Sequence, residues 1–145
     1  MSGELVHTAG RNELQEGPQA AKQAAGPFTP RQLSRLDEAL TLSSRETGLV
    51  FSVYVGEFQQ PTRAHAEALF ERLNDSSVLV AVSPAQRTLH IVTGPRSAER
   101  LPNRACALAA LAMRASFANG DLVGGIVTGL RMLADAAGMS RPAHA

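Results

Sequence analysis

The sequence predicts an α/β domain in which a small mixed sheet of three or four strands lies between helical layers. Apolar residues recur with helical spacing in four segments, and three short runs rich in β-branched residues stand among them. A helix-length segment separates the first two runs, which predicts a parallel crossover. The element order is therefore α-β-α-β-β-α-α, and 145 residues are enough for one such domain.

The first helix begins within "FTPRQLSRLDEALTLSSRETG". Thr29 is a good N-cap, Pro30 suits the first helical position, and Gln32 stands where a capping box has Glu or Gln. Gly48 is a natural C-terminal stop. Three leucines share one face of this helix and predict its contact with the core: Leu33, Leu36 and Leu40.

Three strands and a second helix follow. "LVFSVYV" (49–55) alternates between two faces, and Thr62 is expected to cap a helix over residues 63–73. "SVLVAVS" (77–83) is apolar on both faces, which is typical of a central strand covered by helices on each side. A turn at residues 84–86 leads into "RTLHIVTG" (87–94), the last strand.

Two helices close the domain. Residues 104–117 are apolar almost all round, so this helix is expected to be largely buried. Asp121 is expected to cap the last helix, over residues 122–137. Gly124, Gly125 and Gly129 each cost about 1 kcal/mol of helix propensity relative to Ala. Close packing against the Ala-rich neighbour would offset that cost.

The two ends of the chain are poorer in large apolar residues. Residues 1–27 are expected to form a flexible tail, with a short strand over "ELVHT" (4–8) as the alternative. The folded domain is expected over residues 28–138 and a second tail over 139–145. We see no signal peptide and no apolar run long enough to cross a bilayer, so we expect a cytoplasmic protein without membrane insertion.

The charge balance and the cysteine content argue against several kinds of binding surface, disulfide and metal site. The 14 basic and 13 acidic residues give a net charge of +1, which argues against a broad nucleic-acid-binding surface. Cys106 is the only cysteine, so an internal disulfide and a cysteine-cluster metal site are excluded, and its apolar surroundings predict burial. The oligomeric state stays open.

Several short motifs resemble those of the TPM domain family, over residues 28–137. They are Glu46-Thr47-Gly48 before a strand, Leu69-Phe70, the junction "NDSSVLV" (74–80), and "FANGD" (117–121) followed by Gly125-Ile126. The stretches "FTPRQLSRLDEALTL", "ETGLVFSVYVG" and "SFANGDLVGG" are most similar to an actinobacterial family of unknown function related to TPM domains.

This resemblance implies two kinds of activity. TPM relatives include acid phosphatases, some with a bound divalent metal, and factors for assembly, repair or trafficking of membrane complexes. In the alignment that the resemblance implies, His90 takes the place of a carboxylate near the proposed site, Val92 that of the first glycine, and Gly94 that of the second. Because Ca²⁺ prefers several oxygen ligands, this exchange weakens the implied metal chemistry.

Polar residues at strand ends and in the following loops form the candidate binding site. Asp75 and Asp121 are the candidate metal ligands or acid/base groups, and Arg96 the candidate anion ligand. In the structural alternative, Asp121 caps a helix, Asp75 ends one, and Arg96 is solvated. The full predicted set is Asp75, His90, Thr93, Gly94, Arg96, Asn119 and Asp121.

For His90, His65 and the arginines of residues 95–104, we favour a structural role over a functional one. His90 is interpreted as a half-buried, hydrogen-bonded residue, against the alternative of a ligand or general base. His65 is expected to be solvated on the second helix, and "PRSAERLPNR" (95–104) to be a solvated loop.

Two functional hypotheses follow. The first is a non-catalytic cytoplasmic accessory or protein-interaction module whose partner is another protein and which needs no cofactor. The second is a phosphatase-like hydrolase, or one that binds Ca²⁺ or Mg²⁺, with a degraded TPM site. The hydrolase requires Asp75 and Asp121 in one cleft beside His90, whereas helix capping by each favours the interaction module.

Overall fold

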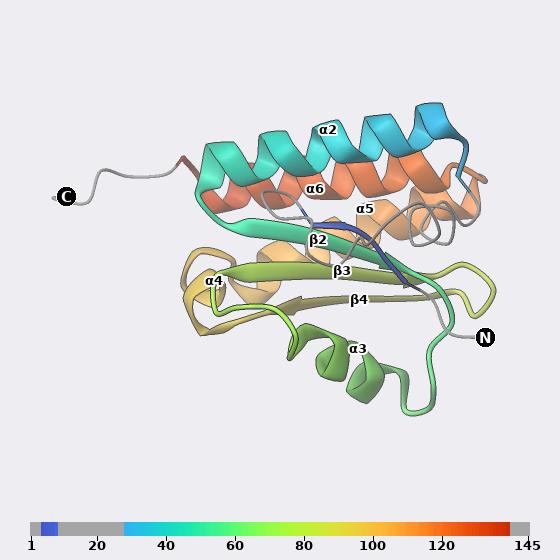
Figure 1. Cartoon of the computed structure of the whole chain (residues 1–145), viewed down its shortest axis with the longest axis horizontal. Helices are drawn as coiled ribbons and strands as arrows, with labels where there is room; N and C mark the ends of the chain where they lie inside the picture. Colours follow the sequence, from blue (N-terminus) through green and yellow to red (C-terminus); the bar gives the residue numbers. More distant parts are fainter. Residues whose placement is uncertain (1–3, 9–27, 140–145) are drawn as a thin grey trace, which may run out of the picture.

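Four strands form a mixed sheet in the computed structural model, which describes residues 4–8 and 28–139 (Figure 1). The strands are β1 (Glu4–Thr8), β2 (Val50–Val55), β3 (Ser77–Ser83) and β4 (Thr88–Thr93), and they lie side by side in that order. β2 and β3 are parallel, and the two outer pairs are antiparallel. The predicted α/β class and the order α-β-α-β-β-α-α are confirmed, with β1 and one short helix as additions.

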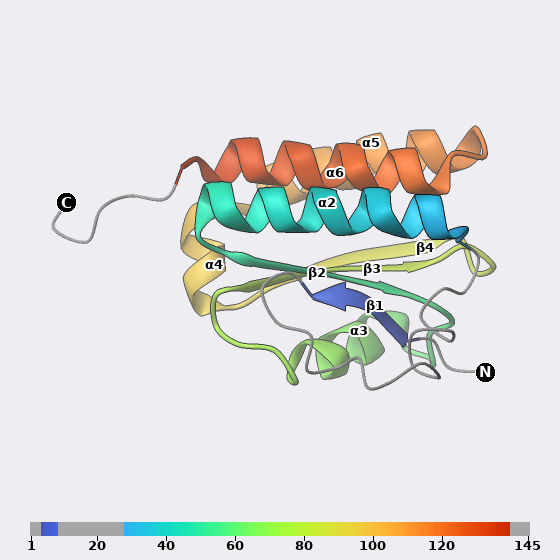
Figure 2. The ribbon, with the colours of Figure 1, turned by 45° about the horizontal axis from the view of Figure 1, so that its top comes forward.

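Helices cover both faces of the sheet, as predicted. On one face lie α2 (Pro30–Thr47), α5 (Asn103–Ala118) and α6 (Leu122–Ala137), with α6 between the other two (Figure 2). On the opposite face, α3 (Thr62–Phe70) is the one helix that the described residues form. The larger apolar core is between the sheet and the three long helices, and the smaller one is between the sheet and α3.

The predicted cap residues begin and end the long helices. Thr29 Oγ1 accepts from the Gln32 N–H at 3.1 Å, and Gln32 Oε1 accepts from the Thr29 N–H at 2.9 Å. This reciprocal pair is the predicted capping box. Gly48 ends α2 in the left-handed region, with φ of 80°. Asp121 Oδ1 accepts from the Gly124 N–H at 2.9 Å and so caps α6.

The N-terminal segment differs from the prediction of a tail over residues 1–27. Residues 4–8 form β1, which pairs with β2 in the register Glu4↔Val55 to Thr8↔Ser52. The alternative of a short strand over residues 4–8 is therefore confirmed. Composition favours a tail there because the backbone of β2 supplies the pairing partner from a distant part of the sequence. The remaining residues of the two predicted tails, apart from Met139, lie outside the described residues.

The prediction that α5 is largely buried is wrong. Only Ala109 and Met113 are fully buried on it, while Leu108 and Leu111 are 51% and 64% exposed. The central helix of the layer is α6, whose glycines admit α5 closely. A Cβ on Gly125 would lie 2.7 Å from Cε1 of Phe117. This confirms the interpretation of the glycines as a close-packed helix face at Gly125.

Residues 95–104 do not form the predicted solvated loop. Pro95–Arg100 form a short helix, α4, at one end of the sheet, and α5 begins at Asn103 (Figure 1). The predicted N-cap of α3 is also wrong by one residue, because Pro61 holds that position and Thr62 is the first helical residue.

Candidate functional site

The predicted site residues do not converge in one cleft. Asp75, Thr93, Gly94 and Arg96 lie together at the end of the sheet where α4 is found. Asn119 and Asp121 lie at the opposite end, in the connection between α5 and α6. The seven residues of β3 separate the two ends, and their six steps correspond to about 20 Å. Asp75 and Asp121 therefore cannot share one metal ion or one substrate atom.

Backbone contacts explain the first of these groups, which we call the α4 end. The Asp75 carbonyl accepts from the Arg96 and Ser97 N–H groups, at 3.1 and 3.2 Å, and so satisfies the first turn of α4. Gly94 is buried against it, and a Cβ there would lie 2.6 Å from the Asp75 oxygen. The side chains of Asp75 and Arg96 are exposed. The contacts at this end are thus made by backbone atoms, and Gly94 is there because the backbones approach closely.

Two side chains that the sequence analysis missed hold the α4 end together. The buried Ser97 hydroxyl accepts from the Gly94 N–H at 2.9 Å and donates to the Ser77 carbonyl at 2.7 Å. Arg100 donates to the Thr47 carbonyl at 2.7 Å and to the Gly138 carbonyl at 2.8 Å. One guanidinium thus satisfies the C-terminal ends of both α2 and α6.

His90 lies on neither end but in the middle of β4, facing α3. Its Nε2 is 2.9 Å from the Thr62 hydroxyl, and its ring packs edge-on against Phe58, with centroids 5.5 Å apart. Burial lowers the pKa of His90 below its ordinary 6.5, and the charges of Arg63 and Arg114 lower it further. A neutral, hydrogen-bonded ring fits the structural interpretation of this residue.

His65 belongs to the same cluster, which contradicts its predicted solvation. Its Nδ1 accepts from the Gln59 N–H at 2.8 Å, and its ring meets Phe58 edge-on at 5.7 Å. Gln86, in the β3–β4 turn, holds the Phe58 backbone from the other side, accepting at 2.6 Å and donating at 2.9 Å. His65 helps to fix the loop before α3, a role that only its tertiary partners reveal.

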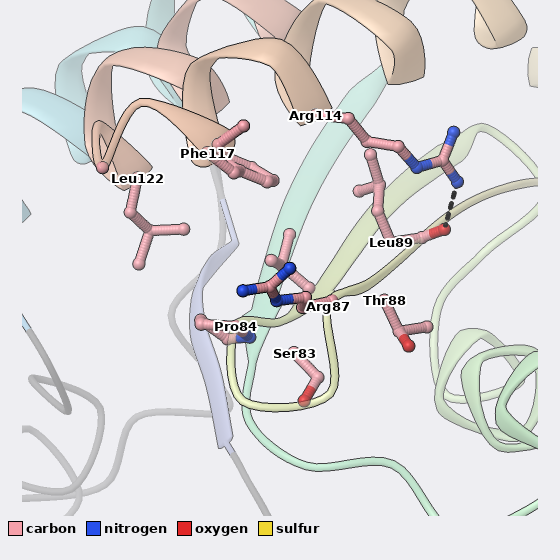
Figure 3. Close-up of a pocket in the computed structure, with 11 residues that line it drawn as sticks. Ser83, Pro84, Arg87, Thr88, Leu89, Arg114, Phe117 and Leu122 are labelled. Carbon is pink, nitrogen blue, oxygen red and sulfur yellow. Dashed lines mark hydrogen bonds between the residues drawn. The ribbon is translucent and has the colours of Figure 1, made fainter.

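A cleft of about 540 Å³ opens at the end opposite α4, between the β3–β4 turn and the α5–α6 connection (Figure 3). We call this the cleft end. Phe117 and Leu122 extend from the helices toward Arg87 and Pro84 of the turn. None of the lining residues is acidic: Val82, Ser83, Pro84, Arg87, Thr88, Leu89, Arg114, Phe117, Ala118, Gly120 and Leu122.

Two arginines give the cleft its charge. Arg114 donates to the Leu89 carbonyl at 3.5 Å, a long bond that leaves most of its five N–H groups free for other partners. The Arg87 guanidinium makes no hydrogen bond or ion pair with any residue in the described ranges. The sequence analysis missed both residues, because the turn and the end of α5 meet only in the fold.

The remaining candidates stand as follows. Cys106 is half-buried, and burial raises the pKa of its thiol, which fits a packing residue more than a nucleophile. Within residues 4–8 and 28–139, no three His, Cys, Asp or Glu side chains are grouped as a metal site would require. In the same residues no helix combines the length and the apolar character needed to span a membrane.

The fold is that of a small mixed α/β domain, and comparison of its sequence with known families shows which family it belongs to. Residues 2–134 match the family described as domain of unknown function DUF5130, and the chain belongs to it. Two uncharacterized proteins from strains of Mycobacterium tuberculosis are each 35% identical over 109 residues. The match covers 74% of this chain and 65% of each relative, so the chain spans less than two thirds of their length.

Solved structures share the fold at low sequence identity. The N-terminal domain of a protein from P. gingivalis has a TM-score of 0.68 and 16% identity, covering 77% of both chains. The BA42 protein of Bizionia argentinensis has a TM-score of 0.65 and 18% identity, covering 75% of this chain and 80% of that one. The N-terminal domain of cg2496 from Corynebacterium glutamicum gives 0.62 and 14%, covering 83% and 84%. These likenesses show the fold alone.

Proposed function

We propose that this DUF5130 domain is a non-catalytic, cytoplasmic protein-interaction module of TPM kinship. The outward face of α5 carries this proposal. Leu108 and Leu111 lie one helical turn apart on it and are both more than half exposed. After Asn103, the first residue of the helix, the exposed residues follow one helical face: Arg104, Ala107, Leu108, Leu111, Arg114, Ala115 and Ala118.

The chemistry of this face favours a particular kind of partner. Small alanines around the two leucines allow another backbone to approach closely, and adjacent exposed leucines are typical of an interaction surface. Arg104 and Arg114 flank the leucines, and α5 contains no acidic residue. The complementary surface is therefore an apolar ridge with a carboxylate toward each end.

The positions of the carboxylates support a non-catalytic role over the hydrolase. Asp121 Oδ1 caps α6, and the Asp75 carbonyl satisfies the start of α4 at the other end of the sheet. The TPM kinship rests on the sequence motifs and on the element order that the structure has. The cytoplasmic location rests on the sequence expectation and is tested by cell fractionation.

The α5 face is tested by binding. The immobilised full chain is compared with Leu108→Gln/Leu111→Gln and with Leu42→Gln, which changes a leucine that is 43% exposed on α2. A protein captured by the wild type and by Leu42→Gln is then purified and titrated. We expect the α5 variant to bind it at least about tenfold more weakly. Equal affinity for all three chains would contradict the proposal.

Catalysis is tested separately with p-nitrophenyl phosphate in the presence of Ca²⁺ or Mg²⁺. The proposal expects no turnover above buffer. Turnover that Asp121→Asn abolishes would overturn it in favour of the hydrolase.

A further inference from the structure

We infer that the cleft between the β3–β4 turn and the α5–α6 connection binds a carboxylate carried by an apolar group. The cleft lies away from Leu108 and Leu111, so this inference does not rest on the proposed function. Its volume of about 540 Å³ lies within the range of small-ligand sites.

The walls supply an apolar surface of the right kind. Phe117 and Leu122 extend into the cleft from the helices, and Leu89 lies on the strand side (Figure 3). Phe117 is held in place, because its ring packs against Gly125 of α6 at the distance of direct contact. This wall is therefore built by the packing of α5 on α6 and is present without a ligand.

The charge comes from two arginines that the fold brings together from separate segments. Arg87 lies in the turn after β3, with φ of 52°, and Arg114 lies in the last turns of α5. Both line the cleft, and among the described residues no acidic side chain lines it with them. A guanidinium presents its N–H groups in a planar fork that matches a carboxylate, so this pair favours a carboxylate ligand.

The other polar groups argue against a more highly charged anion. The Thr88 hydroxyl donates to the Gln86 carbonyl at 2.9 Å, and the Ser83 hydroxyl accepts from the Gln86 N–H at 3.3 Å. Asp121, between the lining residues Gly120 and Leu122, adds a negative charge at that side. A phosphate dianion would be repelled by the Asp121 charge and would find few hydrogen-bond donors beyond the two arginines. A monoanion with an apolar body would instead contact both the arginines and the apolar side chains.

Two sources offer this chemistry, namely a free small carboxylate and the C-terminal residue of a polypeptide. The probes are sodium octanoate below its micelle concentration, octanol as its uncharged counterpart, and N-acetyl-leucyl-leucine with either a free or an amidated C-terminus. Each is titrated into the ¹⁵N-labelled full chain while ¹⁵N–¹H spectra are recorded. We expect saturable shifts in residues 82–89 and 114–122 with a carboxylate probe, and weaker or no shifts with its uncharged counterpart.

Variants then test the arginines. Arg87→Gln and Arg114→Gln are expected to weaken carboxylate binding about tenfold each, while Arg131→Gln, an equal charge change at an exposed position of α6, leaves it unchanged. Because Arg87 has no partner among the described residues, its variant should keep the wild-type spectrum outside the turn.

Each outcome of these titrations either supports the inference or overturns it. Tighter binding of the free peptide than of octanoate identifies a polypeptide C-terminus, and the reverse identifies a free carboxylate; both support the inference. Equal binding of charged and uncharged probes, unchanged affinity in Arg87→Gln, shifts confined to another surface, or no saturable shifts would overturn it. The cleft shares Arg114 with the α5 face, whereas Arg87 lies outside α5, so the result for Arg87→Gln separates this inference from the α5 proposal.

Discussion

The two ends of the sheet are built differently. At the α4 end, the backbones of Asp75 and Gly94 are in contact, and Ser97 and Arg100 satisfy backbone groups from several elements. At the cleft end, the β3–β4 turn and the α5–α6 connection leave a space of about 540 Å³ between them. Arg100 at the first end donates to the C-terminal ends of two helices, α2 and α6, whereas Arg87 at the other end has no partner among the described residues.

This difference shows that residue type does not decide role. Arg100 and Arg87 are the same amino acid in segments that both look polar and solvated in the sequence. Arg100 has its donors committed to backbone carbonyls, and these bonds stabilise the fold. The N–H groups of the Arg87 guanidinium have no acceptor in the part of the chain that the structure describes, so beside an apolar wall they are available to a ligand.

The largest effect is expected from breaking the close contact at the α4 end. A Cβ on Gly94 would lie 2.6 Å from the Asp75 carbonyl oxygen, a backbone atom that cannot rotate away as a flexible side chain would. We expect Gly94→Ala to lower the free energy of unfolding by about 3 kcal/mol. Urea denaturation measures this, with Ala98→Ser as the exposed control on α4. A loss no greater than that of the control would show that the contact is not tight.

Arg100 tests the second connection at the same end. Its guanidinium donates to the Thr47 and Gly138 carbonyls, and Arg100→Gln removes charged hydrogen bonds that contribute about 2 kcal/mol. The matched control is Arg96→Gln, because Arg96 is exposed on the same helix. Equal thermal unfolding of the two variants would mean that the α4 end is held by backbone contacts alone.

The sequence predicted well what local chemistry determines. The capping box at Thr29 and Gln32, the stop at Gly48 and the cap at Asp121 depend on neighbours within four residues, and each was found. The apolar run over residues 77–83 likewise matched β3 to the residue. These features need no knowledge of the rest of the fold.

Features that depend on distant partners were predicted less well. The strand over residues 4–8 was only the alternative to a tail, because β1 exists through its pairing with β2, and the role of Arg100 was missed because it acts through carbonyls 53 and 38 residues away. The predicted site failed for the same reason, because Asp75 and Asp121 follow similar elements but lie at opposite ends. The cleft was missed since Arg87 and Phe117 become neighbours only when α5 packs on α6.

At the cleft end, replacing Asp121 tests how much a single side-chain hydrogen bond contributes to stability. Its side chain accepts one hydrogen bond, from the Gly124 N–H. Asp121→Ala should therefore lose about 1 kcal/mol of stability, while Asp121→Asn keeps nearly all of it because Asn is an equally good N-cap. Both values come from denaturation curves. A loss in Asp121→Asn as large as in Asp121→Ala would show that the carboxylate charge, rather than capping, is what this end requires.

The smallest effect is a pH dependence from His90, which belongs to neither end and has a partner inside the fold. Burial lowers its pKa in the folded state, with Arg63 and Arg114 adding to the shift and Glu67 opposing it. Below its ordinary pKa of 6.5 the unfolded chain therefore takes up a proton more readily than the folded one. Stability from this group is present at neutral pH and is lost as the pH falls through and below 6.5.

The variant His90→Gln should flatten that slope, and Thr62→Val should keep it, because Thr62 supplies only the hydroxyl partner at 2.9 Å. Free energies of unfolding measured across this pH range decide the matter. A wild-type slope that survives in His90→Gln would assign the acid sensitivity to another group. If the dependence of unfolding free energy on pH disappears in His90→Gln, then His90, whose Nε2 has a hydrogen-bond partner inside the fold, causes it.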